Sequence, residues 1–272
     1  AMSLVASAAK PAPKKARPGN QRQTRVVVTT TRPERRLAPG ERRLLDNVVQ
    51  WQAYFDETCR QPHGALVSDE FLGMTSSSRG TETCDVMCDW ALRCELLSAT
   101  GLGRWGDDAE RNFFNAAPAT VSRDFRCHCY FQVPNMVRRE QPYTFSTGKT
   151  HGCRMSHNAV TKCCQGNTNR LLPEYIRFAW LRPQEGGLAA ALWCPCDVST
   201  KVGETEVRVR VRTDYPFGDT VRFVLRSDRP LELAIRYRVP GWCPDPGLKS
   251  ATLKSGEPLE VVFAPPVVRR DD

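Results

Sequence analysis

Two adjacent thiols, Cys163 and Cys164, lie in the segment TKCCQGNTNR at residues 161–170. Neighbouring thiols can form half of a disulfide, bind a metal, combine a nucleophile with a metal ligand, or pack in a core. A second segment, TETC at residues 81–84, offers Glu82 and Cys84. Three thiols and one carboxylate are a plausible ligand set for a tetrahedral Zn²⁺ ion, so these four residues are candidate metal ligands.

The spacing of Glu82 and Cys84 restricts where they can lie. Side chains two positions apart diverge on a regular helix, so this pair can converge only just before a helix or in its first turn. Thr81 is a suitable N-cap for a helix that starts here. A helix N-terminus also stabilises carboxylate and thiolate groups, which suits a metal site.

The adjacent pair Cys163 and Cys164 needs a bend in the backbone, which Gly166 and Asn167 would favour. None of the spacings matches a paired CxxC zinc motif. Spacing alone therefore favours cysteines that pack in the core, and the same holds for CHC at 127–129 and CPC at 194–196. The four histidines follow no metal-binding pattern, and none is a candidate ligand.

The composition is that of a globular protein, with 272 residues, 40% of them hydrophobic and 25% charged. No apolar run is long enough to cross a bilayer, and the first residues contain no secretory signal core. Twelve cysteines could indicate a disulfide framework, but a chain with this much apolar sequence does not need one. The thiol content mildly favours a reducing compartment, and the compartment is otherwise unknown.

The net charge of +9 could indicate a nucleic-acid partner. Residues 1–36 carry nine Lys or Arg and one acid, Glu34, so the remaining residues carry only +1. Residues 1–40 are therefore predicted to be a disordered basic tail. The near-neutral body argues against nucleic-acid binding.

Hydrophobic periodicity predicts helices in the first part of the chain. A stripe that starts at Leu44 predicts a helix over residues 41–58. A second helix begins near Thr81 and ends at Gly101, and a third covers residues 107–117.

Beyond residue 188 the period changes to that of strands. Val207, Val209 and Val211 alternate with arginines, and residues 221–225 and 231–239 repeat this alternation. Short turns separate the three segments, so the sequence predicts an antiparallel sheet with one buried face.

From Gly64 to Trp242 the sequence resembles the β-L-arabinofuranosidase family of glycoside hydrolases. Seven segments match the family's motifs in the family's order and with similar separations. They are DEFLG (69–73), TETC (81–84), DDAERNFFNA (107–116), YFQVPN (130–135), CCQGNTNRLLPEY (163–175), TDYPFGD (213–219) and RVPGW (238–242).

The resemblance implies a mainly α then β fold, a partial (α/α)6 toroid followed by an antiparallel β-sandwich module. Residues 41–185 would form the partial catalytic domain and residues 186–272 an incomplete β-sandwich domain. Family members carry a much longer segment before the DEFLG motif. The chain is therefore expected to be a truncated member that either lacks an N-terminal half-toroid or forms a homo-oligomer.

The resemblance also implies a retaining hydrolase of β-L-arabinofuranosides or related sugars. The implied roles are zinc ligands at Glu82, Cys84, Cys163 and Cys164, the nucleophile at Cys163, the acid/base at Glu70, and sugar contacts at Glu110 and Tyr130. Zinc would keep the nucleophilic thiol deprotonated while Glu70 protonates the leaving oxygen. Without the resemblance, Glu70 would be a solvated loop acid, Glu110 half of a surface pair with Arg104 or Arg111, and Tyr130 a packing residue.

Three functions remain open from the sequence. The leading hypothesis is the zinc-dependent hydrolase, with a carbohydrate substrate and with neither nucleic acid nor membrane as a partner. The second is a non-catalytic carbohydrate-binding or structural remnant that keeps the motifs. The third is a basic nucleic-acid-binding protein with a structural zinc, which the charge distribution disfavours.

Overall fold

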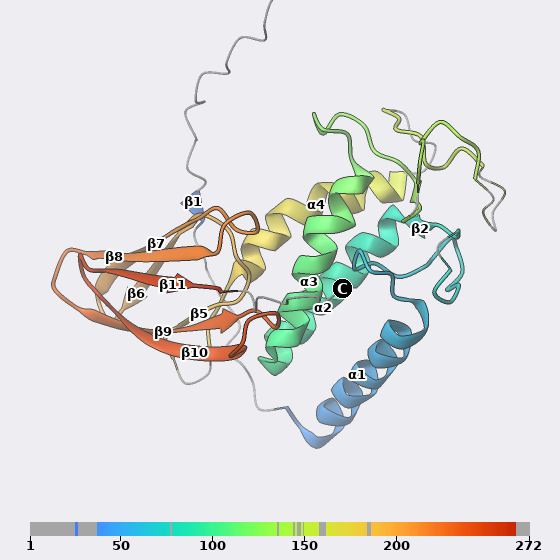
Figure 1. Cartoon of the computed structure of the whole chain (residues 1–272). Helices are drawn as coiled ribbons and strands as arrows, with labels where there is room; N and C mark the ends of the chain where they lie inside the picture. Colours follow the sequence, from blue (N-terminus) through green and yellow to red (C-terminus); the bar gives the residue numbers. More distant parts are fainter. Residues whose placement is uncertain are drawn as a thin grey trace, which may run out of the picture.

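The chain is described by a computed structural model that covers residues 25–26, 37–76, 78–134, 136–143, 145, 148, 150–157, 162–183 and 186–264. The predicted basic tail lies almost wholly outside these residues. Within them, the four α-helices precede all the longer strands, and only two-residue strands lie before or among the helices, which confirms the predicted mainly α then β organisation (Figure 1).

Four α-helices form the first part of the described chain. They are α1 (Pro39–Cys59), α2 (Thr83–Thr100), α3 (Gly103–Asn115) and α4 (Lys162–Ala179), with a short 3-10 turn, η1 (Ala117–Thr120), after α3. Helix α2 ends at Gly101, as predicted. The φ of Gly101 is 66°, in the left-handed region that favours glycine. Periodicity did not predict α4. None of the described helices combines the length and apolarity needed to cross a membrane.

Helix α2 lies between α3 and α4, and aromatic side chains fill the space among them. Trp90 of α2 is 1% exposed and stacks on Tyr175 of α4 with ring centroids 6.1 Å apart. Phe113 of α3 contacts both rings. Burying each large side chain of this kind contributes on the order of 2 kcal/mol, so these contacts fix how α2 and α4 pack.

The strands form a two-sheet module beside the helices (Figure 1). One sheet has the order β1 (Arg25–Val26), β6 (Cys196–Val202), β7 (Thr205–Thr213), β8 (Thr220–Ser227) and β11 (Pro258–Val262). The other has the order β10 (Gly247–Lys254), β9 (Glu232–Val239), β5 (Leu188–Ala190) and β4 (Trp180–Leu181). A separate pair, β2 (Thr81–Glu82) and β3 (Phe131–Gln132), lies at the helical end.

The alternation predicted for the strands is confirmed, but the single sheet is wrong. Val207, Val209 and Val211 are buried as expected on β7. Strands β7 and β8 pair with each other, whereas β9 belongs to the other sheet. The apolar faces of the two sheets meet, as the contact between Phe223 and Tyr237 illustrates. Both sheets are mixed, because β1 pairs with β6 and β5 pairs with β9 in parallel.

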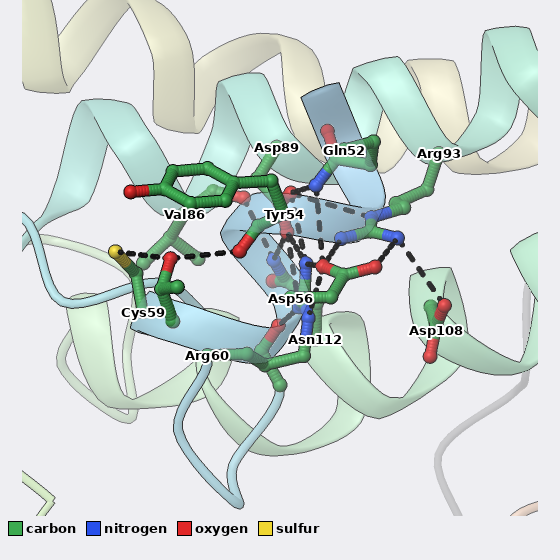
Figure 2. A network of polar contacts seen from close by, with 12 residues as sticks. Gln52, Tyr54, Asp56, Cys59, Arg60, Val86, Asp89, Arg93, Asp108 and Asn112 are labelled. Carbon is green, nitrogen blue, oxygen red and sulfur yellow. Dashed lines mark hydrogen bonds and ion pairs between the residues drawn. The ribbon is translucent and has the colours of Figure 1, made fainter. Parts of the chain in front are cut away.

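A buried network of charges attaches α1 to α2 and α3 (Figure 2). The fully buried Arg93 side chain of α2 pairs with Asp56 of α1, Asp89 of α2 and Asp108 of α3. Arg60, just after α1, also pairs with Asp89 at 3.1 Å. Burial raises the pKa of Asp89 to about 6, although Arg60 opposes this. The two arginines therefore hold the end of α1 against the middle of α2.

Only half of the apolar stripe predicted on α1 faces the core. Gln52 is buried, and Leu45 and Val49 pack against the core. A second row remains in solvent, with exposed fractions of 66% at Leu44, 39% at Val48, 63% at Trp51 and 54% at Tyr54. Contiguous exposed apolar side chains of this size favour association.

We expect Asp89→Asn to lower the free energy of unfolding by about 3 kcal/mol, because it leaves two buried guanidinium groups short of a negative charge. Urea unfolding followed by circular dichroism measures this loss. Glu232→Gln is the control, since Glu232 pairs with Lys254 at 3.5 Å in solvent and such pairs contribute little. Equal losses in the two variants would contradict the structural importance of the network.

We expect the chain to self-associate through the exposed row of α1. Trp51→Lys should weaken self-association about tenfold or more, because it removes a large apolar contact. Sedimentation at several protein concentrations measures the change. Phe217→Lys is the control, since Phe217 is 97% exposed but lies in an isolated turn. A wild-type chain that stays monomeric at every concentration would refute the prediction.

Candidate metal and active site

The first turn of α2 carries two of the candidate ligands. Glu82 is the last residue of β2 and the N-cap of α2, with an extended backbone at φ −70° and ψ 142°, and Cys84 follows in the first turn. The predicted location just before and within the first turn is therefore confirmed. Thr81 is not the N-cap, because it belongs to β2 and its Oγ1 donates a hydrogen bond to Leu66 O at 2.7 Å.

The first turn of α4 carries the other two. The bend predicted near Gly166 and Asn167 is wrong, because α4 continues through both residues. No bend is needed, since successive side chains at a helix start already point about 100° apart. Cys164 points into the protein and is fully buried, whereas Cys163 is exposed.

The four side chains meet where α2 and α4 begin. The Sγ atoms of Cys84 and Cys164 are 3.5 Å apart, and those of Cys163 and Cys164 are 3.9 Å apart. Glu82 Oε1 lies 3.9 Å from Cys163 Sγ and 3.7 Å from Cys164 Sγ. All four ligand atoms lie within 4.8 Å of one another.

These distances fit a tetrahedral metal site. Zinc–sulfur bonds of about 2.3 Å place tetrahedral sulfur ligands about 3.8 Å apart, and a carboxylate oxygen about 3.5 Å from each sulfur. The four separations given above match these values to within a few tenths of an ångström, and the two sulfur–sulfur distances are too long for disulfides. The arrangement can therefore hold a divalent ion that favours sulfur ligands.

Burial makes the cluster dependent on a cation. It raises the pKa of the Cys84 thiol to about 12 and that of Cys164 well above its usual range. Both thiols would therefore stay protonated at neutral pH unless a cation stabilised their thiolates. Partial burial of the neighbouring Asp85 raises its pKa to about 8, so it adds little negative charge near neutral pH.

Glu70 and Tyr130 lie beside the cluster. The backbone N–H of Glu82 donates to Ser68 O, and Glu82 pairs with Phe131 across β2 and β3, so the segments carrying Glu70 and Tyr130 flank β2. Tyr130 Oη donates a hydrogen bond to Glu70 Oε1. Burial, and then this hydrogen bond, raise the pKa of Tyr130, as does the charge of Glu82. The phenol is therefore a neutral donor.

Glu70 has an unusual backbone conformation. Its φ is 81°, in a region that residues other than glycine rarely adopt. The flanking segment is held by a main-chain hydrogen bond that Ser68 N donates to Gly80 O and by the Arg79–Asp69 ion pair. Strained residues held in this way cluster at functional sites.

The structure does not bring Glu110 to the cluster. Glu110 is 4% exposed and lies where α3 meets the strand module. Its carboxylate pairs with Arg238 at 2.5 Å and accepts hydrogen bonds from Trp193 N at 2.9 Å and Tyr215 Oη at 2.8 Å. The surface pair with Arg104 or Arg111 considered from sequence is wrong, because Glu110 is buried and pairs with Arg238. Its implied sugar contact stays a prediction.

Arg238 is a residue whose role sequence reasoning missed. It is 2% exposed and also pairs with Asp107 of α3, whose carboxylate accepts a hydrogen bond from Gly241 N at 3.0 Å. Three matched motifs, DDAERNFFNA, TDYPFGD and RVPGW, thus meet at one joint between helices and strands. The sequence signal for a role of Arg238 was its place in the matched RVPGW motif. The alternation on β9 gave no such signal, because it placed Arg238 on the face opposite the apolar row.

The arrangement offers one exposed sulfur, a metal-binding set behind it, and a glutamate held by a tyrosine. An exposed thiolate is a nucleophile, and a nearby carboxyl group can give or accept a proton. Together these groups can perform substitution at an electrophilic carbon with acid assistance.

The sequence matches two family profiles. They are described as the beta-L-arabinofuranosidase GH127 catalytic domain, over residues 27–177, and the GH127 middle domain, over residues 187–257. No curated protein matches the sequence.

Several solved structures resemble this one. A GH127 beta-L-arabinofuranosidase from Geobacillus stearothermophilus T6 is 18% identical with a TM-score of 0.68, and the match covers 85% of this chain and 40% of that one. A structure described as a glycoside hydrolase is 19% identical with a TM-score of 0.68, covering 83% and 44%. A GH127 beta-arabinofuranosidase is 16% identical with a TM-score of 0.64, covering 83% and 40%. At these identities the likeness shows the fold, and this chain spans about two fifths of those chains.

We expect purified protein to hold about one metal ion per chain, as a single tetrahedral site requires. The double variant Cys84→Ser, Cys164→Ser should lose the ion, because it removes the two more buried sulfurs. Elemental analysis after gel filtration measures this. Cys88→Ser is the control, since Cys88 is exposed and outside the cluster. Full metal retention in the double variant would rule out the assignment.

We expect Glu110→Gln to lower the free energy of unfolding by about 3 kcal/mol, because Arg238 would stay buried with less compensating charge. Thermal and urea unfolding measure the loss, with Glu260→Gln as an exposed control that pairs with Arg222. Unchanged stability together with weaker sugar binding would instead favour the sugar contact implied by the resemblance.

Proposed function

Because this chain belongs to the GH127 beta-L-arabinofuranosidase family, we propose that it is a retaining glycoside hydrolase that acts on β-L-arabinofuranosides or related glycosides. The observation that carries the proposal is the cluster at the start of α2 and α4, in which Cys163 is the exposed sulfur. A nucleophile must reach its substrate, so exposure favours Cys163 over the buried Cys164 in this role.

The metal that we propose for Glu82, Cys84, Cys163 and Cys164 is Zn²⁺. Three sulfurs and one carboxylate at tetrahedral spacing are a donor set that zinc favours. When bound, zinc would keep the thiols ionised at neutral pH, against the effect of burial on Cys84 and Cys164.

The reaction proposed for these residues has two steps. Cys163 Sγ attacks the anomeric carbon, the glycosidic bond breaks, and Glu70 gives its proton to the leaving oxygen. Glu70 then takes a proton from a water molecule, which attacks the same carbon and releases Cys163. Two displacements at one carbon retain its configuration.

Tyr130 acts on Glu70 in this proposal. Its phenol donates a hydrogen bond to Glu70 Oε1, which leaves the other carboxyl oxygen to carry the transferred proton. The raised pKa of Tyr130 keeps the phenol protonated throughout. We therefore assign Tyr130 to orienting Glu70, beside the sugar contact implied by the resemblance.

A non-catalytic carbohydrate-binding or structural remnant is the second candidate. One observation favours it, namely that Glu110, for which the resemblance implies a sugar contact, is enclosed where α3 meets the strand module and pairs with Arg238. Such a remnant would keep the metal and the fold without turnover.

We expect the chain to hydrolyse an aryl β-L-arabinofuranoside and Cys163→Ser to have no detectable turnover, because a serine hydroxyl is not ionised at neutral pH. Glu70→Gln should slow poor leaving groups by about a hundredfold or more and activated aryl groups much less, since the latter need little protonation. Release of the aryl alcohol measures both.

Mass spectrometry of a trapped glycosyl-enzyme should place the sugar on the peptide that contains Cys163. A label on Glu70, Glu82 or Glu110 would mean a carboxylate nucleophile and would leave the cysteines as ligands only. Metal-loaded, folded protein that binds the sugar without turnover would establish the remnant instead.

A further inference from the structure

A second thiol lies opposite an imidazole, outside the cluster. Residues 121–128 form a hairpin in which Val121 pairs with His128, and His128 also pairs in antiparallel fashion with Ser156. His128 and Ser156 exchange both main-chain hydrogen bonds, at 3.3 and 3.0 Å. The register therefore places Cys127 directly opposite His157, in the non-hydrogen-bonded position where side chains lie closest.

The side chains make the contact that the register predicts. Cys127 Sγ lies 3.1 Å from His157 Nδ1. Cys127 is half-buried and His157 is exposed, whereas His128 on the opposite face of the same segment is buried. Packing in a core therefore explains Cys129, which is fully buried, but it does not explain Cys127.

We propose that Cys127 and His157 form a reactive thiol site, separate from the metal cluster, that exchanges with small anionic disulfides. His157 takes the proton of the Cys127 thiol, and the thiolate attacks one sulfur of the disulfide. The old sulfur–sulfur bond breaks as the new one forms, and the departing thiolate takes the proton from His157. One thiol and one disulfide are consumed and one of each is produced, so no further oxidant is needed.

The charges around the hairpin favour an anionic partner. The hairpin tip carries Arg123 and Arg126, and the Arg126 side chain is 79% exposed. Asp124 is the single acid in the tip and lies 3.9 Å from Arg126. Phe125 between them is 69% exposed and offers an apolar surface to the organic part of the disulfide.

Cys88 gives a matched comparison within the same chain. It is an exposed thiol, whereas Cys127 is half-buried. The polar neighbours of Cys88 are Arg170 at 3.7 Å and Asn167 at 4.0 Å, and neither of them is a base. Burial of part of the Cys88 side chain raises its pKa. Cys88 is thus the more exposed of the two thiols, and a contact with an imidazole is what Cys127 has and Cys88 lacks.

The test uses the full-length, metal-loaded protein with glutathione disulfide as the probe. Time-resolved peptide mass spectrometry follows the mixed disulfide at each cysteine at pH 7. A free thiol is only a few per cent ionised at this pH, so a paired base can accelerate exchange by at most about thirtyfold. We expect Cys127 to react about tenfold faster than Cys88.

Two variants distinguish the effect of losing the imidazole base from an effect on folding. His157→Gln should reduce the rate at Cys127 to that of Cys88 while the circular dichroism spectrum stays unchanged. In His157→Ala, free imidazole should restore the rate at Cys127 without changing that at Cys88. Neutral hydroxyethyl disulfide should show a smaller preference for Cys127 than glutathione disulfide does.

Three results would overturn the proposal. Cys127 could react no faster than Cys88, or His157→Gln could leave its rate unchanged, and either result would mean that the imidazole does not activate the thiol. An equal preference with the neutral disulfide would refute the anionic partner. The test does not depend on glycosidase activity, so a chain without turnover can still pass or fail it.

Discussion

The contact between the first turns of α2 and α4 is the constraint on which the site depends. Four ligand atoms within 4.8 Å of one another come from residues about 80 positions apart, and they meet only if the two helices start at the same level. The aromatic packing of Trp90 against Tyr175 sets the distance between the helices. Both N-termini favour negative charge, so the backbone itself stabilises the thiolates and the carboxylate of the cluster.

Two buried arginines connect this centre to its surroundings. Arg93 holds α1 and Asp108 against α2, and Arg238 holds the strand module against α3. A buried ion pair adds little net stability compared with an apolar contact, because desolvation opposes it. It is nevertheless costly to break, so each arginine fixes one arrangement of its neighbours. Helix α2 is thereby held to α1 and α3, and α3 is held to the strand module.

Exposure divides the cysteines into different chemical groups. Cys164 is buried within the cluster, Cys163 is its exposed member, and Cys127 lies in solvent-facing contact with an imidazole. The extended segment that carries Cys127 continues to Tyr130, whose phenol donates to Glu70. A modification at Cys127 would therefore occur three residues from the group that orients the proposed acid, which connects the two sites through one backbone segment.

The sequence by itself determined the order of helices and strands, the glycine that ends α2, and the residue types of the cluster. Each of these follows from local periodicity or from ligand chemistry, and the motifs carried the family. Only the tertiary structure decided that Glu110 pairs with Arg238 and that Cys127 faces His157. It also decided that half of the apolar row on α1 faces solvent and that β9 belongs to a different sheet from β7 and β8. Periodicity reports which side chains avoid water, but a partner more than a hundred residues away is chosen by packing, which a local pattern does not contain.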